Sequence, residues 1–146
     1  MATIGSPAPQ VQRPRRDWFL SAMAILFALL ALSDFTKPFQ HRNDPGHLGL
    51  VIFGHRLATF GANAIGGPIF GIILATYAYG LLTQKRWLKP LSIVYAFYVP
   101  TNLTLFWSLH ANPPPTVGFI VVYLILSVGG SVGTALYIGY HHDRLR

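Results

Sequence analysis

The feature that most constrains this sequence is a set of four long stretches that carry almost no charge. A helix needs about 20 mostly apolar residues to cross the ~30 Å hydrocarbon core of a bilayer. The ranges 18–36, 57–82, 90–109 and 116–140 meet that requirement, and Asp34 is the single charged residue within them. Inside a bilayer every backbone polar group must bond within the chain, which favours helices. We therefore predict an all-α integral membrane protein, built as a bundle of four transmembrane helices.

The overall composition excludes several other classes of protein. Hydrophobic residues make up 52% of the chain and charged residues only 10%, whereas soluble domains carry about 25% charged residues. Disordered chains are poor in apolar residues, so disorder is excluded as well. There is no cysteine, which rules out disulfides, thiolate metal sites and cysteine nucleophiles. No Glu occurs anywhere in the chain, which argues against a proton-coupled antiporter built on a mid-membrane carboxylate.

The basic residues predict the orientation of the bundle. Eight of the eleven Lys and Arg residues fall in the N-terminal tail, in the loop between the second and third ranges, and in the C-terminal tail. Basic loops stay in the cytoplasm, so both termini are expected there. The predicted organisation is a basic tail at 1–16, a transmembrane domain at 17–140 with an outer loop at 37–56, and a basic tail at 141–146.

The outer loop contains a further apolar stretch at 48–54, with the sequence LGLVIFG. Merging it with the second span would give a helix of over 50 Å at ~1.5 Å per residue, which is too long for a bilayer. We therefore expect 48–54 to be an interfacial or re-entrant segment beside the second helix.

A polar layer is expected in the outer half of the membrane. Asn63 lies seven residues beyond Arg56, Asn102 seven residues before Leu109 and Tyr123 seven residues beyond Thr116, so all three are about 10 Å deep at helical rise. Tyr95 and Tyr98 share a helix face with Asn102. These side chains are candidates for lining a ligand cavity. Alternatively, Asn63 and Asn102 hydrogen-bond to each other or to neighbouring helices and hold the bundle together.

Above this layer we expect an outer-face polar cluster of Asp34, His55, Arg56 and His110. An anion is disfavoured at a helix C-terminus, so Asp34 is expected to pair with a cation. Lys37 is close in sequence, and Arg56 at the same membrane level is the leading candidate. His41, His47 and His55, with Asp34 or Asp44, are weak candidates for a metal site, because their spacing matches no standard zinc motif.

Small residues mark the expected helix contacts, because they let helices approach closely in lipid. Gly67 and Gly71 form a G-x-x-x-G pattern in the second span. Gly129 and Gly133 form a stripe in the fourth span, on the side opposite a second stripe that includes Ser131. Two such stripes on one helix favour two close neighbours. Either both stripes pack within the bundle, or one of them contacts another protomer or subunit.

These observations lead to three functional hypotheses. The first is a non-enzymatic structural or accessory subunit of a larger membrane complex, because no catalytic constellation is present. The second is a small oligomeric transporter or channel for a neutral or lipidic solute. The third is a membrane enzyme that acts on a lipid or quinone at the outer face. The expected partners are the lipid bilayer and other membrane subunits or further copies of the chain. Nucleic acid is not expected, and the sequence leaves any cofactor open.

Overall fold

The computed structural model describes residues 17–43, 49–57, 59–110 and 117–145, and most of these residues are helical. The helices are α1 (Trp18–Phe35), α2 (Lys37–Asn43), α3 (Phe60–Thr83), α4 (Leu88–His110), α5 (Val117–Leu124) and α6 (Gly130–Tyr140), and the strands are β1 (Val51–Ile52) and β2 (His55–Arg56). A π-helical turn, Ile125–Gly129, joins α5 to α6, and a 3-10 turn, His142–Arg144, follows α6.

Within the described residues, three helices are long and apolar enough to cross a membrane: Trp18–Phe35, Phe60–Thr83 and Ile120–Tyr140. The expectation of a mostly helical chain with apolar helices that could span a membrane is confirmed at this level. The range 90–109 lies within α4, which has 23 residues but carries more polar side chains and is less apolar than these three. The four-span bundle with cytoplasmic termini stays a prediction.

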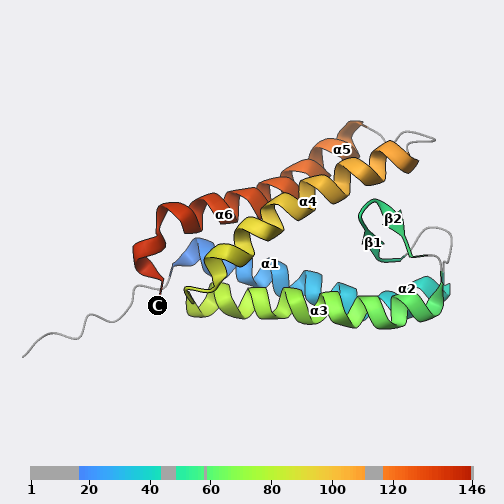
Figure 1. Ribbon diagram of the computed structural model, residues 1–146, viewed down its shortest axis with the longest axis horizontal. Helices are drawn as coiled ribbons and strands as arrows, with labels where there is room; N and C mark the ends of the chain where they lie inside the picture. Colours follow the sequence, from blue (N-terminus) through green and yellow to red (C-terminus); the bar gives the residue numbers. More distant parts are fainter. Residues whose placement is uncertain (1–16, 44–48, 58, 111–116, 146) are drawn as a thin grey trace, which may run out of the picture.

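The helices are arranged as two packed pairs (Figure 1). One pair is α1 and α3, which lie against each other along their length. The other pair is α4 and the interrupted helix formed by α5, the π-helical turn and α6. The pairs meet where α1 begins and α6 ends, and they diverge toward the other end of the molecule. The two pairs therefore form a wedge with a narrow end and an open end. Within this open end lies the β1–β2 hairpin, from the region 37–56 that was expected to be a loop. That region also contains the short helix α2.

Two glycines explain the close packing of α1 on α3. A Cβ built on Gly67 would lie 2.5 Å from the Asp34 carbonyl oxygen, and one built on Gly71 would lie 2.9 Å from the Phe35 ring. A larger residue at either position would push the helices apart. The G-x-x-x-G pattern therefore packs α3 against α1 and the start of α2, inside the chain.

The hydrophobic core lies toward the end where the two pairs meet. Its members come from α1, α3, α4 and α6 and from the residue after the 3-10 turn: Leu20, Ala24, Phe27, Ala31, Leu74, Tyr77, Ala78, Leu81, Leu88, Ile138 and Leu145. The Phe27 ring packs edge-on against Tyr77 and Tyr95, with ring centroids 4.7 and 5.4 Å apart. This core fixes the narrow end of the wedge.

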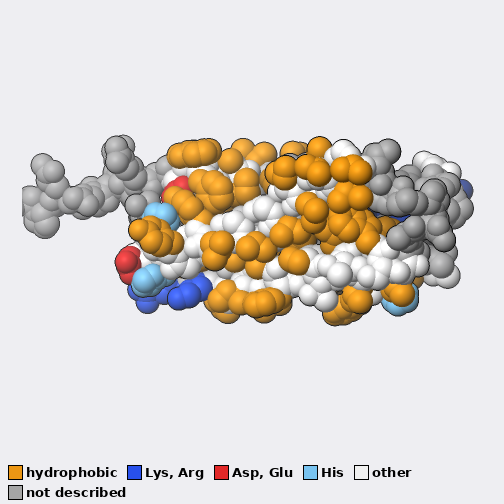
Figure 2. Space-filling model, turned by 90° about the horizontal axis from the view of Figure 1, so that it is seen from above, with side chains coloured by type: hydrophobic (Ala, Val, Ile, Leu, Met, Phe, Trp, Pro, Cys, Tyr) orange, Lys and Arg blue, Asp and Glu red, His pale blue; other side chains and the backbone are white. Residues whose placement is uncertain are grey.

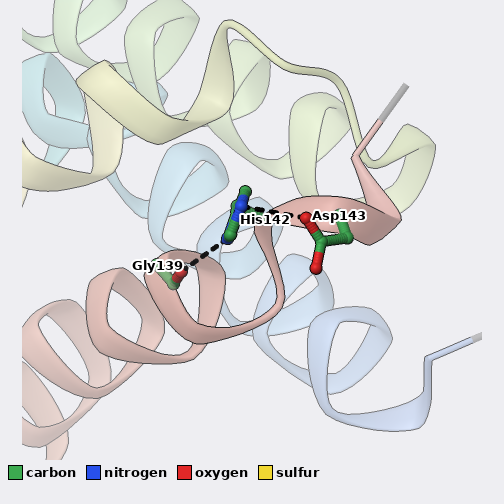
Figure 3. A network of polar contacts seen from close by, with 3 residues as sticks. All are labelled: Gly139, His142 and Asp143. Carbon is green, nitrogen blue, oxygen red and sulfur yellow. Dashed lines mark hydrogen bonds and ion pairs between the residues drawn. The ribbon is translucent and has the colours of Figure 1, made fainter.

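The start of α1 is tied to the end of α6. The Asp17 carboxylate caps α1 by accepting from the backbone N–H of Phe19 at 3.1 Å, and it also accepts from the Tyr137 hydroxyl at 2.6 Å. The Phe19 and Tyr137 rings lie 4.5 Å apart. Just beyond, His142 contacts the carbonyl of Gly139 at 3.3 Å and the carboxylate of Asp143 at 2.9 Å (Figure 3).

The surface matches a chain that is immersed in lipid. Large apolar side chains are exposed on every long helix, including Ile25 on α1, Ile72 on α3, Phe97 on α4 and Leu136 on α6. Figure 2 shows hydrophobic side chains along most of one face, with charged and His side chains gathered most densely at the end where α6 finishes. An apolar belt with charges at its ends is typical of membrane proteins.

Candidate functional site

The β1–β2 hairpin turns at Phe53 and Gly54, in the open end of the wedge. Ile52 pairs with His55 and Val51 with Arg56. The φ angles of Phe53 and Gly54 are +46° and +78°, and a two-residue loop with two positive φ angles matches the twist of a hairpin. A Cβ on Gly54 would lie 2.6 Å from the Cβ of Leu105 on α4. Only glycine therefore allows the turn to lie directly against α4.

Asn63 holds the hairpin from the side of α3. Its side chain is fully buried, and its Oδ1 accepts from the backbone N–H of Leu50 at 2.8 Å. Its Nδ2 donates to the carbonyls of Leu57 and Thr59 at 2.8 and 2.9 Å. The amide thus bonds to the backbone just before the hairpin, at Leu50, and just after it, at Leu57 and Thr59.

Asn102 holds the same hairpin from the side of α4. Its Oδ1 accepts from the backbone N–H of Gly54 at 2.9 Å, and its Nδ2 donates to the Val51 carbonyl at 3.2 Å. The Arg56 guanidinium lies 5.6 Å from the centroid of the Phe106 ring, close enough for a cation–π contact. Asn63 and Asn102 therefore bond to the hairpin backbone from its two sides and do not bond to each other.

A cavity of about 620 Å³ lies between the two helix pairs, next to the hairpin. Ligand pockets in proteins typically measure about 300–1,000 Å³. The walls are mainly apolar and come from α1, α3 and α4, and they include Leu26, Phe27, Leu30, Phe70, Ile73, Leu74, Leu91 and Val94. The wall residues Leu30, Ile73 and Val94 are 41%, 41% and 64% exposed. The cavity therefore opens at its rim toward the surroundings of the helices.

Polar groups gather where the cavity meets the hairpin and the end of α1. Ser33, Asp34, Lys37, Tyr98 and Asn102 line this part of the wall. Asp34 and Lys37, three residues further along the chain, carry opposite charges and line the same part of the wall as Tyr98. Among the described residues, none forms a hydrogen bond with the buried Tyr98 hydroxyl. The cavity thus combines long apolar walls with a small polar end.

A second set of small polar groups lines the cavity from the side of α6. Ser127, Gly130 and Ser131 face it, and the Ser131 hydroxyl donates to the Ser127 carbonyl at 2.7 Å. Ser127 belongs to the π-helical turn that joins α5 to α6. Single π-helical turns inside helices occur frequently at functional sites, so the irregular backbone at this wall agrees with a binding role.

The structure brings together only some of the residues expected at a site. Tyr95, Tyr98 and Asn102 line the cavity, whereas Asn63 is engaged with the hairpin. The side chains of Tyr123, His41 and His110, and the whole of Asp44 and His47, lie outside the described part. Among the side chains that are described, no group of three or more potential metal ligands comes together.

The ion pair between Asp34 and Arg56 stays a prediction. The two residues lie in different surroundings, because Asp34 lines the cavity beside Lys37 while Arg56 lies over Phe106. The His55 side chain is exposed on β2. The expected outer-face cluster is therefore split between the cavity wall, where Asp34 lies, and the hairpin, which carries His55 and Arg56.

Ser33, which lines the polar end of the cavity, and the Phe53-Gly54 turn were not predicted from the sequence, whereas Lys37 was expected as a possible local partner of Asp34. Comparisons with protein-family models, curated proteins and solved structures found no match for this chain. The site is interpreted from its own geometry.

Proposed function

We propose that this protein binds one amphipathic, lipid-like molecule in the cavity between the α1–α3 and α4–α6 pairs, as a non-enzymatic component of its membrane. The observation that carries the proposal is the cavity itself, which has apolar walls, exposed rim residues on three helices and one polar end. An alkyl or isoprenoid chain fits the walls, and a polar head fits the end near Asp34 and Tyr98.

The energetics favour an occupied cavity. Unfilled space beside apolar side chains forfeits dispersion contacts with every lining atom. An apolar chain from the bilayer restores those contacts without removing any polar group from water. The exposed side chains of Leu30, Ile73 and Val94 at the rim support entry from the lipid side.

The test is a cavity-filling variant with a matched control on the same helix. Gly130 lines the cavity, and a Cβ built there meets only the side chain of Leu26, at 3.9 Å. Gly130→Leu should therefore place its side chain into the cavity without a backbone clash. Around Gly139 a built Cβ meets no described atom within 4 Å, so Gly139→Leu makes the same chemical change outside the cavity.

Lipid that co-purifies with each variant in mild detergent is measured by native mass spectrometry. We expect bound lipid to fall several-fold in Gly130→Leu and to stay at the wild-type level in Gly139→Leu. Equal occupancy in all three proteins would contradict binding in this cavity.

The accessory-subunit role has its own supporting observation on α6. A Cβ built on Gly129 or Gly133 meets no described atom within 4 Å, so this small-residue stripe is open to a second helix. We propose that it contacts a further copy of the chain or another membrane subunit. Gly133→Leu should then abolish association in crosslinking experiments, with Gly139→Leu as control, and unchanged association would exclude this face.

We further propose that both termini lie in the cytoplasm, because Lys85, Arg86 and Lys89 cluster in the α3–α4 connection and at the start of α4. The chain has no native cysteine, so an introduced cysteine is the single thiol that a maleimide can label. A membrane-impermeant maleimide should label His55→Cys in intact cells and Arg86→Cys only after permeabilisation. The reverse pattern would overturn the orientation.

A further inference from the structure

The groups that line the polar end of the cavity determine which ligand head group fits there. We infer that the site selects an amphiphile whose head is an uncharged oxygen group, a hydroxyl or a carbonyl, over one whose head is a phosphate. This inference rests on the proposed function, and it follows from the charge and the hydrogen-bonding capacity of the groups that line this end.

The charge at the polar end is balanced and does not favour an anion. Asp34 and Lys37 both line the cavity and carry opposite charges. Asp34 would repel a phosphate directly. This part of the wall also lies at the C-terminal end of α1, where the helix dipole disfavours negative charge. Strong phosphate sites use Arg or helix N-termini, and the described Arg56 is engaged with Phe106.

The hydrogen-bonding groups suit an uncharged oxygen. The Tyr98 hydroxyl is buried and, within the described part of the chain, has no hydrogen-bond partner. A tyrosine hydroxyl can donate to a ligand carbonyl or hydroxyl. The Asp34 carboxylate can accept a hydrogen bond from a ligand hydroxyl. Asn102 already uses its Oδ1 and one N–H on the hairpin, so it adds little to recognition.

The experiment compares two probes that share their acyl chains and differ in their heads. The purified full-length chain is titrated with dioleoylglycerol and with dioleoyl phosphatidic acid, and binding is followed by native mass spectrometry. We expect dioleoylglycerol to bind at least about tenfold more tightly. Tyr98→Phe keeps the ring and removes only the oxygen, and one lost hydrogen bond should weaken dioleoylglycerol binding by roughly 2- to 13-fold.

The control for the hydroxyl is Tyr79→Phe, because Tyr79 is exposed and lies outside the cavity wall. It should leave both affinities unchanged. Asp34→Asn leaves Lys37 unbalanced, so the affinity for phosphatidic acid should rise several-fold.

The outcomes separate this inference from the proposed function. Equal or tighter binding of phosphatidic acid by the wild-type chain, abolished by Gly130→Leu, would overturn the head-group inference and leave the cavity as the binding site. An absence of binding for both probes would overturn the inference together with the proposed function. Weaker dioleoylglycerol binding in Tyr98→Phe and unchanged binding in Tyr79→Phe would support it.

Discussion

Replacing Asn102 with leucine tests how the hairpin is held in the open end of the wedge. The substitution keeps a side chain of similar size and removes the hydrogen bonds to the Gly54 N–H and the Val51 carbonyl. Each such bond contributes about 0.5–1.5 kcal/mol net, and polar contacts inside membranes average about 0.6 kcal/mol. A buried group left without a partner costs about 1–3 kcal/mol.

These values place the loss of hairpin docking energy at about 2 kcal/mol or more. Since every 1.4 kcal/mol is tenfold in an equilibrium constant, hairpin opening should become about 30-fold more frequent. Hydrogen exchange of a peptide covering 50–57 measures this opening directly. The control is Thr104→Val, because Thr104 is exposed on α4, and its exchange should match wild type. Unchanged exchange in 50–57 of Asn102→Leu would show that the Asn102 hydrogen bonds do not hold the hairpin in place.

Two further substitutions test the packing of the helix pairs by thermal unfolding in detergent. Gly67→Ala should destabilise the chain by about 1–3 kcal/mol, because its Cβ overlaps the Asp34 carbonyl, whereas Gly61→Ala, with no described atom near its Cβ, should be neutral or stabilise by about 0.4–1 kcal/mol. Equal effects of the two would refute the close approach of α1 and α3. Tyr137→Phe should cost about 1 kcal/mol through loss of the hydrogen bond to Asp17, and an unchanged melting temperature would show that this bond does not stabilise the join between α1 and α6.

The helices could be predicted from the sequence because hydrocarbon imposes a simple rule of length and charge. The ranges 18–36 and 57–82 differ from α1 and α3 by at most three residues at either end. The main difference is at the start of the second range. There the chain is still leaving the hairpin, and α3 begins only after Thr59, whose hydroxyl accepts from the Ala62 N–H.

The site was harder to predict because its polar side chains hydrogen-bond to backbone groups. Asn63 and Asn102 stand out in the sequence as polar residues at equal depth, and both are hydrogen-bonded. Their partners are N–H and carbonyl groups of the hairpin, which no side-chain pattern reveals. Phe53 adopts a positive φ, a conformation that aromatic residues rarely adopt, so the turn carries a weak sequence signal. The position of Arg56 over Phe106 follows from that turn.

Photocrosslinking of the wild-type chain tests the central claim most directly. A neutral lipid that carries a diazirine in its acyl chain is bound to the purified protein and illuminated, and the modified residues are located by peptide mass spectrometry. Insertion should concentrate in the stretches of α1 and α4 that wall the cavity, 26–34 and 91–99. Adducts confined to outward side chains such as Ile125, Leu136 and Tyr140 would contradict a bound molecule between the helix pairs.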